Sequence, residues 1–486
     1  MFTCLFKSFY KSFVICFYPL GRAIRIVQSG FYVGSMIPNL IEIRIYVPIC
    51  QSETYKSYIL QILFAEIPAP VKGDIASFND QILFIFNLVI FGSLAGSGIF
   101  TAQFFGKGDE EGVRNSTRFK FITVGIVLAI AFAILLSRGD QLISLFIHEG
   151  EDSLDLAATL HYGKQYLRIM LFQMPMFALL NVYSSALRET GETKLPMRAG
   201  ITAVFVNLIF NYLLIFGKFG APRLGVTGAA TATLIARIVE CTIIIGFSHA
   251  HTERHPFLRG LYSTMAVPLP LAKQISSTGI LLLVNELLWS GGMTTLNQIM
   301  SRRGLEVVSA ENIAATISNL FFCAFFAMGT ALSIIVGQLL GAGQLDQAVE
   351  EDRKLIAFSV VFSAAVGLIM ALIAPLVPHM YNTTPLVRQL AAGMILINAI
   401  MMPANAFTNA SFFTLRSGGR SFITFLYDIV YIWILAIPVT FCLVTFTDLP
   451  IIPIYAVCYG IDIVKCLIGY ILVKKRIWVN NLVADS

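Results

Sequence analysis

Residues 175–193 read PMFALLNVYSSALRETGET, and residues 403–421 read PANAFTNASFFTLRSGGRS. Seven residues recur at an offset of 228, the last conservatively: Pro175 as Pro403, Ala178 as Ala406, Asn181 as Asn409, Leu187 as Leu415, Arg188 as Arg416, Gly191 as Gly419 and Thr193 as Ser421. A second motif recurs at an offset of 235: Gln103, Gly106 and Gly108 as Gln338, Gly341 and Gly343. These ordered matches predict a duplicated chain with two related halves.

The composition places this duplication in a membrane. Of 486 residues, 57% are hydrophobic and 13% are charged, whereas a soluble chain carries about 25% charged residues. Too few polar residues remain to cover soluble domains, so a soluble enzyme is excluded. Twelve helices of about 20 residues would fit within the chain. The net charge of +6 is no nucleic-acid signature in so apolar a sequence.

Hydropathy predicts eleven membrane-spanning helices and an all-α polytopic fold. They cover residues 78–105, 119–137, 166–188, 196–216, 225–248, 275–300, 312–340, 355–377, 390–415, 422–446 and 451–473. A repeat of six helices enters the membrane twice in the same sense. Two six-helix lobes would then be related by a pseudo-two-fold axis along the membrane normal. We expect an N-lobe over 78–255, an inter-lobe loop over 256–272 and a C-lobe over 273–486.

The first helix is the exception. Carried back by 235, the helix at 275–300 predicts a counterpart near residues 40–65, but that stretch contains Glu42, Arg44, Gln51, Glu53 and Lys56. A more apolar alternative at about 9–37 contains Arg22 and Arg25. Charged side chains are costly in hydrocarbon, so residues 1–77 form an anomalous segment.

Loop charges predict the orientation. Seventeen Lys and Arg residues, among them Lys120, Arg188 and Arg416, fall in one alternating set of loops, and seven fall in the other. The basic side should be cytoplasmic, together with the C-terminus, in a multi-pass protein of a bacterial cell membrane. The acidic loop with Glu149, Glu151, Asp152 and Asp155 would face outside.

Two carboxyl groups within predicted helices are candidates for coupling to a cation. Glu286, beside Asn285, has no basic residue within a turn and could exchange a proton; the alternative is a neutral, hydrogen-bonded structural acid. Asp428 is either a second carrier or a residue that bonds at a helix end. The i,i+3 spacings of Arg237 with Glu240, and of Asp462 with Lys465, indicate structural pairs.

Amide side chains supply further candidates. Asn207 and Asn211 share one helix face, and Asn181 lies on the preceding helix. They could coordinate a cation or a polar group of a drug, or form plain interhelical hydrogen bonds. The eight cysteines include no C-x-x-C pair, and the chain has no P-loop, nucleophile elbow or H-E-x-x-H motif. We therefore expect no metal, no cofactor and no enzymatic activity.

The repeat motifs resemble the multidrug and toxic compound extrusion (MATE) family of antiporters. The resemblance rests on GKGD at 106–109, SALR at 185–188 with GETK at 191–194, NYLLIFG at 211–217, GVTGAA at 225–230 and VGQLLG at 336–341. It extends from about residue 78 to residue 475. Because it begins abruptly near Asn79, residues 12–77 are hypothesised to come from a frameshifted, disrupted or mispredicted reading frame.

The resemblance implies two six-helix lobes around a V-shaped cavity. It also implies export of cationic or amphipathic organic compounds in exchange for H⁺ or Na⁺. Glu286 matches a coupling glutamate of part of the family, Asn207 matches a cation-site asparagine, and Thr231 lies near an expected threonine ligand. Asn211 and Asn405 stand where other members have aspartates. The resemblance therefore favours Glu286 and Asp428 as the residues that couple to the cation.

We expect a monomer in the lipid bilayer, with small organic substrates and no nucleic-acid partner. One alternative is a lipid-linked oligosaccharide flippase of related architecture, which should line its cavity with basic residues. Few such residues are visible within the predicted helices. Another alternative is an inactive or impaired copy that does not transport.

Overall fold

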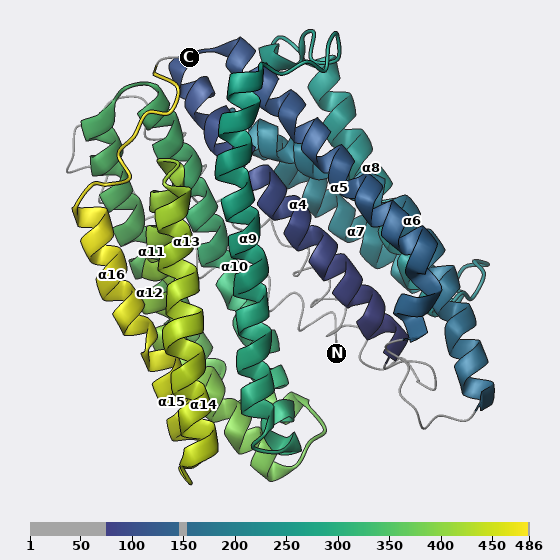
Figure 1. Ribbon diagram of the computed structural model, residues 1–486. Helices are drawn as coiled ribbons and strands as arrows, with labels where there is room; N and C mark the ends of the chain where they lie inside the picture. Colours follow the sequence, from purple (N-terminus) through teal and green to yellow (C-terminus); the bar gives the residue numbers. More distant parts are fainter. Residues whose placement is uncertain (1–73, 145–152, 485–486) are drawn as a thin grey trace. The chain divides into compact units, whose positions relative to one another are not determined.

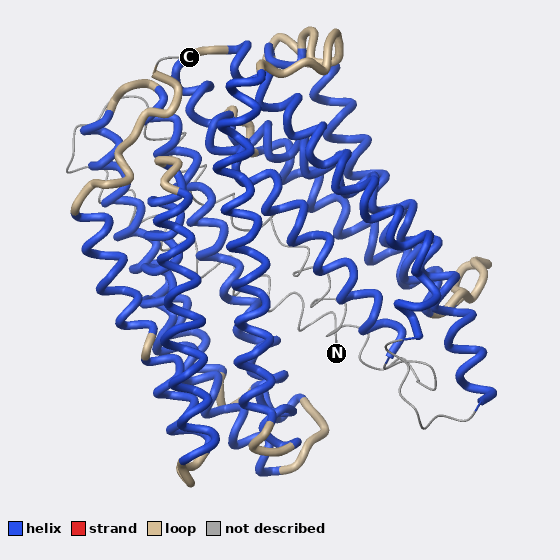
Figure 2. The backbone as a smooth tube through the Cα atoms, in the orientation of Figure 1, coloured by secondary structure: helices blue, strands red, loops and turns tan. Residues whose placement is uncertain are grey.

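The computed structural model describes residues 74–144 and 153–484. The predicted first helix lies outside these residues, as do Glu149, Glu151 and Asp152 of the acidic loop. The described part of the chain is helical without strands, as Figure 2 shows, and 11 of its helices are long and apolar enough to cross a membrane. The prediction of an all-α polytopic membrane protein, with its eleven legible helices, is thus confirmed.

The described helices of the first half are α4 (Asp74–Lys107), α5 (Glu110–Ser144), α6 (Ser153–Glu189), α7 (Lys194–Phe216) and α8 (Val226–Ala250). In Figure 1, α4 lies beside α5, while α7 and α8 pack against each other and α8 also packs against α6. Their shared core contains Phe100, Leu187 and Leu261, all fully buried. A short 3-10 turn, η1 (Pro256–Leu258), lies in the connection to the second half and packs against α5.

The second half begins with α9 (Leu269–Ser301), α10 (Leu305–Gly341), α11 (Leu345–Ile373), the 3-10 turn η2 (Val377–Met380) and α12 (Pro385–Ser417). Two interrupted spans follow. The first consists of α13 (Ser421–Val430), the π-helical turn η3 (Tyr431–Ala436) and α14 (Ile437–Phe446), and the second of α15 (Ile451–Gly460) and α16 (Asp462–Lys474). Proline lacks an amide donor, so Pro438 at the start of α14 accounts for the interruption at η3.

The duplicated motifs adopt the same backbone conformation in both halves. Gly191 and Gly419 have φ of +84° and +70°, and Gly108 and Gly343 have φ of +80° and +75°. These values lie in the left-handed region, where a residue without a Cβ is favoured. Pro175 and Pro403 both lie inside long helices, α6 and α12. The sequence repeat therefore corresponds to a structural repeat.

The two halves meet where α4 crosses α10. A Cβ on Gly106 would lie 1.9 Å from the carbonyl oxygen of Gln338, and a Cβ on Gly341 would lie 1.9 Å from the carbonyl oxygen of Gln103. The contact is reciprocal because each motif glycine faces the backbone of the other half's motif. Small residues permit such close approach between membrane helices.

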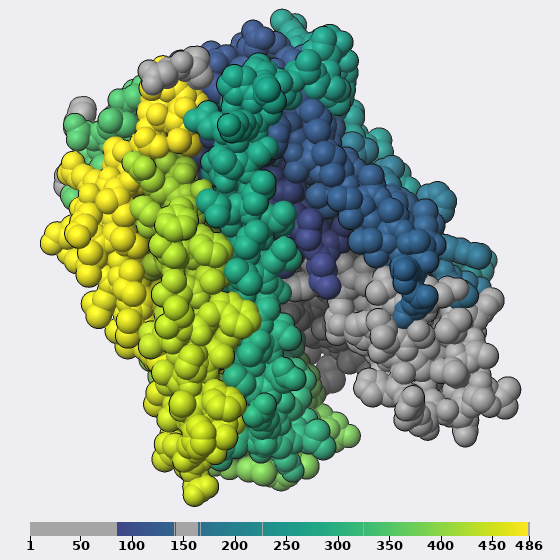
Figure 3. Space-filling view, viewed as in Figure 1, coloured from purple at the N-terminus to yellow at the C-terminus, as the bar shows by residue number. Residues whose placement is uncertain are grey.

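Helix α9 belongs to the second half but contacts both halves. Its Gly279 faces Gly96 of α4, where a Cβ on Gly96 would lie 2.5 Å from the Gly279 Cα atom. Further along, α9 packs against α13 and α14, which lie beside it on the face shown in Figure 3. A displacement of α9 would therefore change packing contacts in both halves.

The C-terminal segment, residues 475–484, also joins the halves. Lys107 of α4 donates to the carbonyl of Val483 at 2.6 Å, and the Leu482 amide donates to Gln103 Oε1 at 2.8 Å. On the other half, Asn480 Nδ2 donates to the carbonyl of Gly418 at 3.3 Å. Trp478 is fully buried beside the same glycine. The segment is thus bonded to α4 and to the end of α12.

Candidate functional site

One cluster of the predicted site residues lies among α9, α13 and α16. Asn285 Nδ2 donates to Asp428 Oδ2 at 3.2 Å, and Lys465 Nζ of α16 contacts Asp428 Oδ1 at 2.5 Å. Asn285 and Asp428 are both buried. Their contact joins the α9 helix of the candidate coupling residue to the last two spans.

The predicted pairing of Lys465 with Asp462 is wrong. Lys465 forms its ion pair with Asp428 instead, and Asp462 accepts a hydrogen bond from the Tyr431 hydroxyl. The ammonium group lies 5.1 Å from the ring centre of Tyr427 and 5.2 Å from that of Tyr431. The ion pair with the buried Asp428 carboxylate therefore determines where the ammonium group lies, and the two rings add a weaker attraction to the cation. The other predicted pair, Arg237 with Glu240, is confirmed at 2.8 Å.

Glu286 differs from Asp428 in having no fixed partner. Its half-buried carboxyl group forms no hydrogen bond or ion pair within the described residues. The charges of Asp428 and of Arg416 on α12 are both close enough to act on it. Of the two acids, Glu286 is therefore the one whose carboxyl group is not held by a hydrogen bond or an ion pair within the described residues. The cation that acts on it, Arg416, was not revealed by sequence spacing.

The asparagines of the first half form a second cluster. Asn211 Nδ2 donates to Asn207 Oδ1 at 3.0 Å, and Asn207 Nδ2 donates to Thr233 Oγ1 of α8 at 3.3 Å. Thr231, the threonine singled out from the sequence, donates to the carbonyl of Thr227 on its own helix. Thr233 was missed because Thr231 and Thr233 have similar sequence surroundings, and helix rotation alone distinguishes them.

The other two predicted amide side chains form no hydrogen bond to another helix within the described residues. Asn181 donates to the carbonyl of Phe177 at 2.9 Å within α6 and lines a cavity between the halves. Asn405, on α12, is half-buried, and its side chain bonds to none of the described residues. The structure thus brings Asn285 together with Asp428 and brings Asn207 together with Asn211, while Asn181 and Asn405 belong to neither cluster.

A cavity of about 80 Å³ lies between α4 and α6 of the first half and α10 and α12 of the second. Its apolar wall includes Phe91, Ile99 and Phe413. Its polar lining groups include Asn181, Ser185, Arg188, Glu189, Thr330, Ser333 and Arg416. The equivalent arginines of the sequence repeat, Arg188 and Arg416, therefore line the same cavity.

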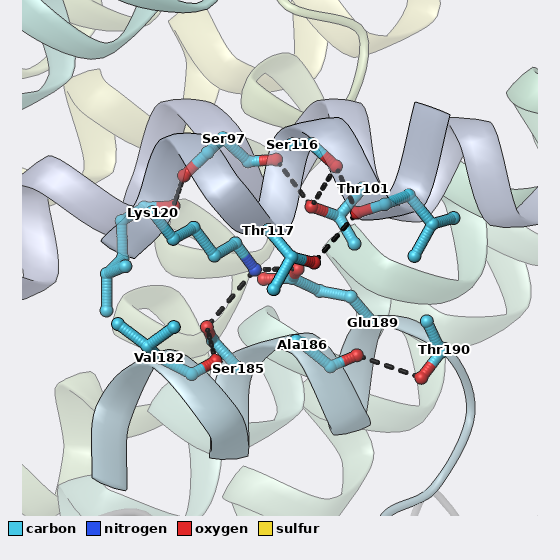
Figure 4. Close-up of polar contacts among 12 residues, drawn as sticks. Ser97, Thr101, Ser116, Thr117, Lys120, Val182, Ser185, Ala186, Glu189 and Thr190 are labelled. Atoms are coloured by element: carbon cyan, nitrogen blue, oxygen red, sulfur yellow. Dashed lines mark hydrogen bonds and ion pairs between the residues drawn. The ribbon is translucent and has the colours of Figure 1, made fainter. Parts of the chain in front are cut away.

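A buried ion pair lies behind the wall of this cavity. Lys120 of α5 contacts Glu189 of α6 and donates to Ser185 Oγ at 3.1 Å, as Figure 4 shows. The Lys120 side chain is fully buried. The placement of Lys120 and Arg416 in loops is therefore wrong: both lie inside helices, where polar partners or aromatic rings surround them, and they are not exposed loop cations. Neither their burial nor their partners could be read from hydropathy.

The MatE family model matches residues 59–213 and 282–442, one segment in each half. The chain belongs to the MatE family. The first matched segment begins at residue 59, before residue 78, where the resemblance was expected to begin, so the hypothesis of a disrupted reading frame over residues 12–77 is wrong for residues 59–77. The family match does not extend to residues 1–58.

Relatives of this MatE chain include proteins named for multidrug resistance. It is 25% identical over 401 residues to the probable multidrug resistance protein NorM of Thermotoga maritima, covering 80% of this chain and 83% of NorM. It is 24% identical over 340 residues to the multidrug resistance protein MdtK of Pectobacterium atrosepticum, covering 69% of this chain and 72% of MdtK.

Solved structures share the fold. An outward-facing multidrug resistance MATE transporter of the MOP superfamily has a TM-score of 0.79 at 18% identity, covering 90% of this chain and 95% of that one. The Vibrio cholerae MATE transporter VcmN has a TM-score of 0.77 at 17% identity, covering 92% and 98%. This MatE chain is therefore a multi-pass membrane protein with the fold of MATE transporters, in a family with multidrug efflux relatives.

Proposed function

We propose that the protein is a secondary antiporter. It exports cationic or amphipathic organic compounds from the cytoplasm in exchange for H⁺ or Na⁺, and its two halves alternate access to the two sides of the membrane. The protein lies in the cell membrane, and its C-terminal segment is on the cytoplasmic side. The working unit is a monomer that needs no organic cofactor.

The position of Glu286 carries this proposal. Its carboxyl group has no fixed partner among the described residues, so it is available to bind a proton or Na⁺. It lies on α9, whose Gly279 packs against Gly96 of α4. A change of charge on α9 therefore acts on the helix that contacts both halves. A bound ion can shift a conformational balance only if it binds the two arrangements with different affinity.

Asp428 is assigned a supporting role. Its carboxylate is already held by Lys465 and Asn285, which ties α9 to α13 and α16. We propose that a change of charge at Glu286 acts through this contact. The cluster of Asn207, Asn211 and Thr233 is the corresponding polar site of the first half, where amide oxygens can bind a cation.

Substitution of Glu286 by Gln tests the proposal. In proteoliposomes with an imposed pH or Na⁺ gradient, wild-type protein should move a fluorescent dye such as ethidium, and Glu286→Gln should reduce this transport to the background of empty vesicles. Glu306→Gln, at an exposed position of α10, is the matched control and should transport normally. Size-exclusion elution should be unchanged in both variants. Undiminished transport by Glu286→Gln would remove Glu286 from the mechanism.

The flippase alternative is favoured by one observation, namely that Arg188 and Arg416 both line the cavity. Basic residues in this position were the feature expected of a protein that binds a lipid-linked pyrophosphate. A lipid-scrambling assay on the same proteoliposomes separates the two functions. Movement of the lipid without gradient-driven dye transport would replace the antiporter proposal by the flippase.

A further inference from the structure

We propose that the C-terminal segment, residues 475–484, is a latch that holds the two halves together on the cytoplasmic side. The segment must release the first half before the molecule can open towards the cytoplasm. This inference rests on the proposed function for the sidedness of the protein and for the opening itself. It adds to that function a contact that sets how often the cytoplasmic side opens.

The junction to which the segment binds contains one equivalent glutamine from each half. Gln103 Nε2 of α4 donates to the carbonyl of Ser417, the last residue of α12, at 3.1 Å. Gln338 Nε2 of α10 donates to the carbonyl of Glu189, the last residue of α6, at 2.8 Å. Gln338 repeats Gln103, and Ser417 stands 228 residues after Glu189, which is the offset of the first motif. Each half is therefore bonded to a helix end of the other half in the same way.

The segment adds further bonds at the glutamine of the first half. Gln103 Oε1 accepts a hydrogen bond from the Leu482 amide at 2.8 Å. One turn further along α4, Lys107 Nζ donates to the carbonyl of Val483 at 2.6 Å. Gln103 is thus bonded at once to Ser417 of the other half and to the segment, so both contacts hold α4 in its present position.

The two fully buried side chains of the segment belong to different halves. Val483 is buried in the shared core of the first half. Trp478 is buried where α12 of the second half ends, and a Cβ on Gly418 would lie 1.7 Å from the carbonyl oxygen of Trp478. The segment follows α16, so it inserts a side chain of the second half into the core of the first half.

The covalent connection decides which end of the segment releases. Residue 475 follows α16 directly, and Arg420 Nε donates to the carbonyl of Ile477 at 3.1 Å, so the start of the segment stays with the second half. Val483 is the fifth residue after Trp478, and a chain spans at most about 3.6 Å per residue, so the segment can follow only a limited movement. A larger opening withdraws Val483 from the first half. Burial of this side chain therefore stabilises the closed arrangement alone.

The rate of cysteine modification from the cytoplasmic side tests the latch. Ala102 of α4 is buried and faces Gly337 of α10, so a cysteine at this position reacts when the halves separate. The reagent is a sulfonated maleimide, which does not cross membranes, added to inside-out membrane vesicles. They contain the full chain with Ala102→Cys and with its eight native cysteines replaced by alanine. The labelling rate is then proportional to the fraction of molecules open to the cytoplasm.

Release of the latch should increase this rate. Val483→Ala should raise it about tenfold, because two buried methyl groups are removed from a contact made only in the closed arrangement. Val483→Asp should raise it further, because a carboxylate is costly in an apolar core. Ala484→Asp introduces the same charge at the exposed neighbouring residue and should keep the wild-type rate. If Val483→Asp does not reach the membrane, Val483→Ala decides, and an unchanged rate for it would overturn the proposal.

A second valine separates release of the latch from general loosening of the core. Val113 of α5 is buried in the same core as Val483, but its helix belongs to the first half in both arrangements. Val113→Ala removes the same two methyl groups and should keep the wild-type labelling rate. Equal increases for Val113→Ala and Val483→Ala would show that Val483 only stabilises the core, and would overturn the latch.

The latch and the antiporter function can fail independently. Faster labelling of Val483→Ala in a protein whose wild type moves no dye under a gradient would refute the antiporter alone. Gradient-driven dye transport by the wild type, with no change of labelling in Val483→Ala, would refute the latch alone.

Discussion

At the scale of single residues, contacts with other helices determine where the buried charged side chains lie, and neighbours in the sequence do not. Lys120 and Arg416 lie near helix ends in the sequence, where basic residues normally report orientation. In the structure, Lys120 is neutralised by Glu189, and Arg416 lies between two aromatic rings. The count of Lys and Arg residues in predicted loops therefore includes residues whose side chains are buried in the helix bundle.

Loss of one partner of the buried pair should be strongly destabilising. Lys120→Met leaves Glu189 buried without its cation, and we expect the free energy of unfolding to fall by about 3 kcal/mol. The double variant Lys120→Met/Glu189→Gln should recover part of this loss because no uncompensated charge remains. Thermal unfolding in detergent measures both effects. Lys354→Met, which breaks the exposed pairs with Glu350 and Glu351, is the control and should leave the melting temperature unchanged.

His255, in the connection between the two halves, should make the free energy of unfolding depend on pH. Burial lowers the pKa of His255 below its usual range, and its Nε2 atom has no partner within the described residues. The folded state thus binds fewer protons than the unfolded state as the pH falls through about 6.5, so stability is full above this pH and is lost below it. Melting temperatures between about pH 7.5 and 5.5 should decline less steeply for His255→Gln.

Exposed His379, in the turn η2 of the second half, provides the comparison for this measurement. His379→Gln should keep the wild-type pH dependence, because this side chain is not among the groups that act on His255. An identical slope for the wild type and His255→Gln would show that another group causes the decline.

At the scale of elements, the crossing of α4 and α10 depends on the absence of two side chains. Gly106 and Gly341 each face the backbone of the opposite half at a distance that excludes a Cβ. The contact cannot be relieved by a rotamer change because the obstructing atoms are carbonyl oxygens. The two helices must separate if either glycine is replaced.

Gly106→Ala and Gly341→Ala should therefore each destabilise the protein by about 1–3 kcal/mol, as overpacking does. Gly246→Ala is the control, since a Cβ on Gly246 in α8 meets nothing within 4 Å. It should be neutral or slightly stabilising because alanine favours helix. Equal melting temperatures for all three variants would contradict the close crossing.

At the scale of the whole molecule, transport by alternating access requires the halves to separate where α4 now contacts α10. A Cβ on Gly337 would lie 3.3 Å from the Cβ of Ala102, close to the range that a disulfide needs. The double variant Ala102→Cys/Gly337→Cys should cross-link on oxidation. It should then lose gradient-driven dye transport and regain it after reduction.

The single cysteine variants control for pairing with native cysteines. They should transport normally under oxidising and reducing conditions alike. Full transport by the cross-linked double variant would show that the two halves need not separate at this point.

Much of the fold was predictable because it depends on local patterns. Apolar length predicts each of the eleven helices, since a span must satisfy its backbone groups internally. The recurrence of Gly191 as Gly419 predicted two related halves, and both glycines adopt a positive φ. Helix ends were less predictable: the helix expected at 119–137 runs from Glu110 to Ser144, since polar residues continue helices beyond the apolar core.

The sequence by itself thus determined the membrane class, the helix count from residue 74 onward and the duplication. Only the tertiary structure decided that Lys465 pairs with Asp428, that Thr233 rather than Thr231 contacts Asn207, and that Arg188 and Arg416 line one cavity. The physical reason is that hydropathy depends on composition along one helix. A side-chain partner on another helix depends on the rotation and crossing of both, which packing of the whole bundle sets.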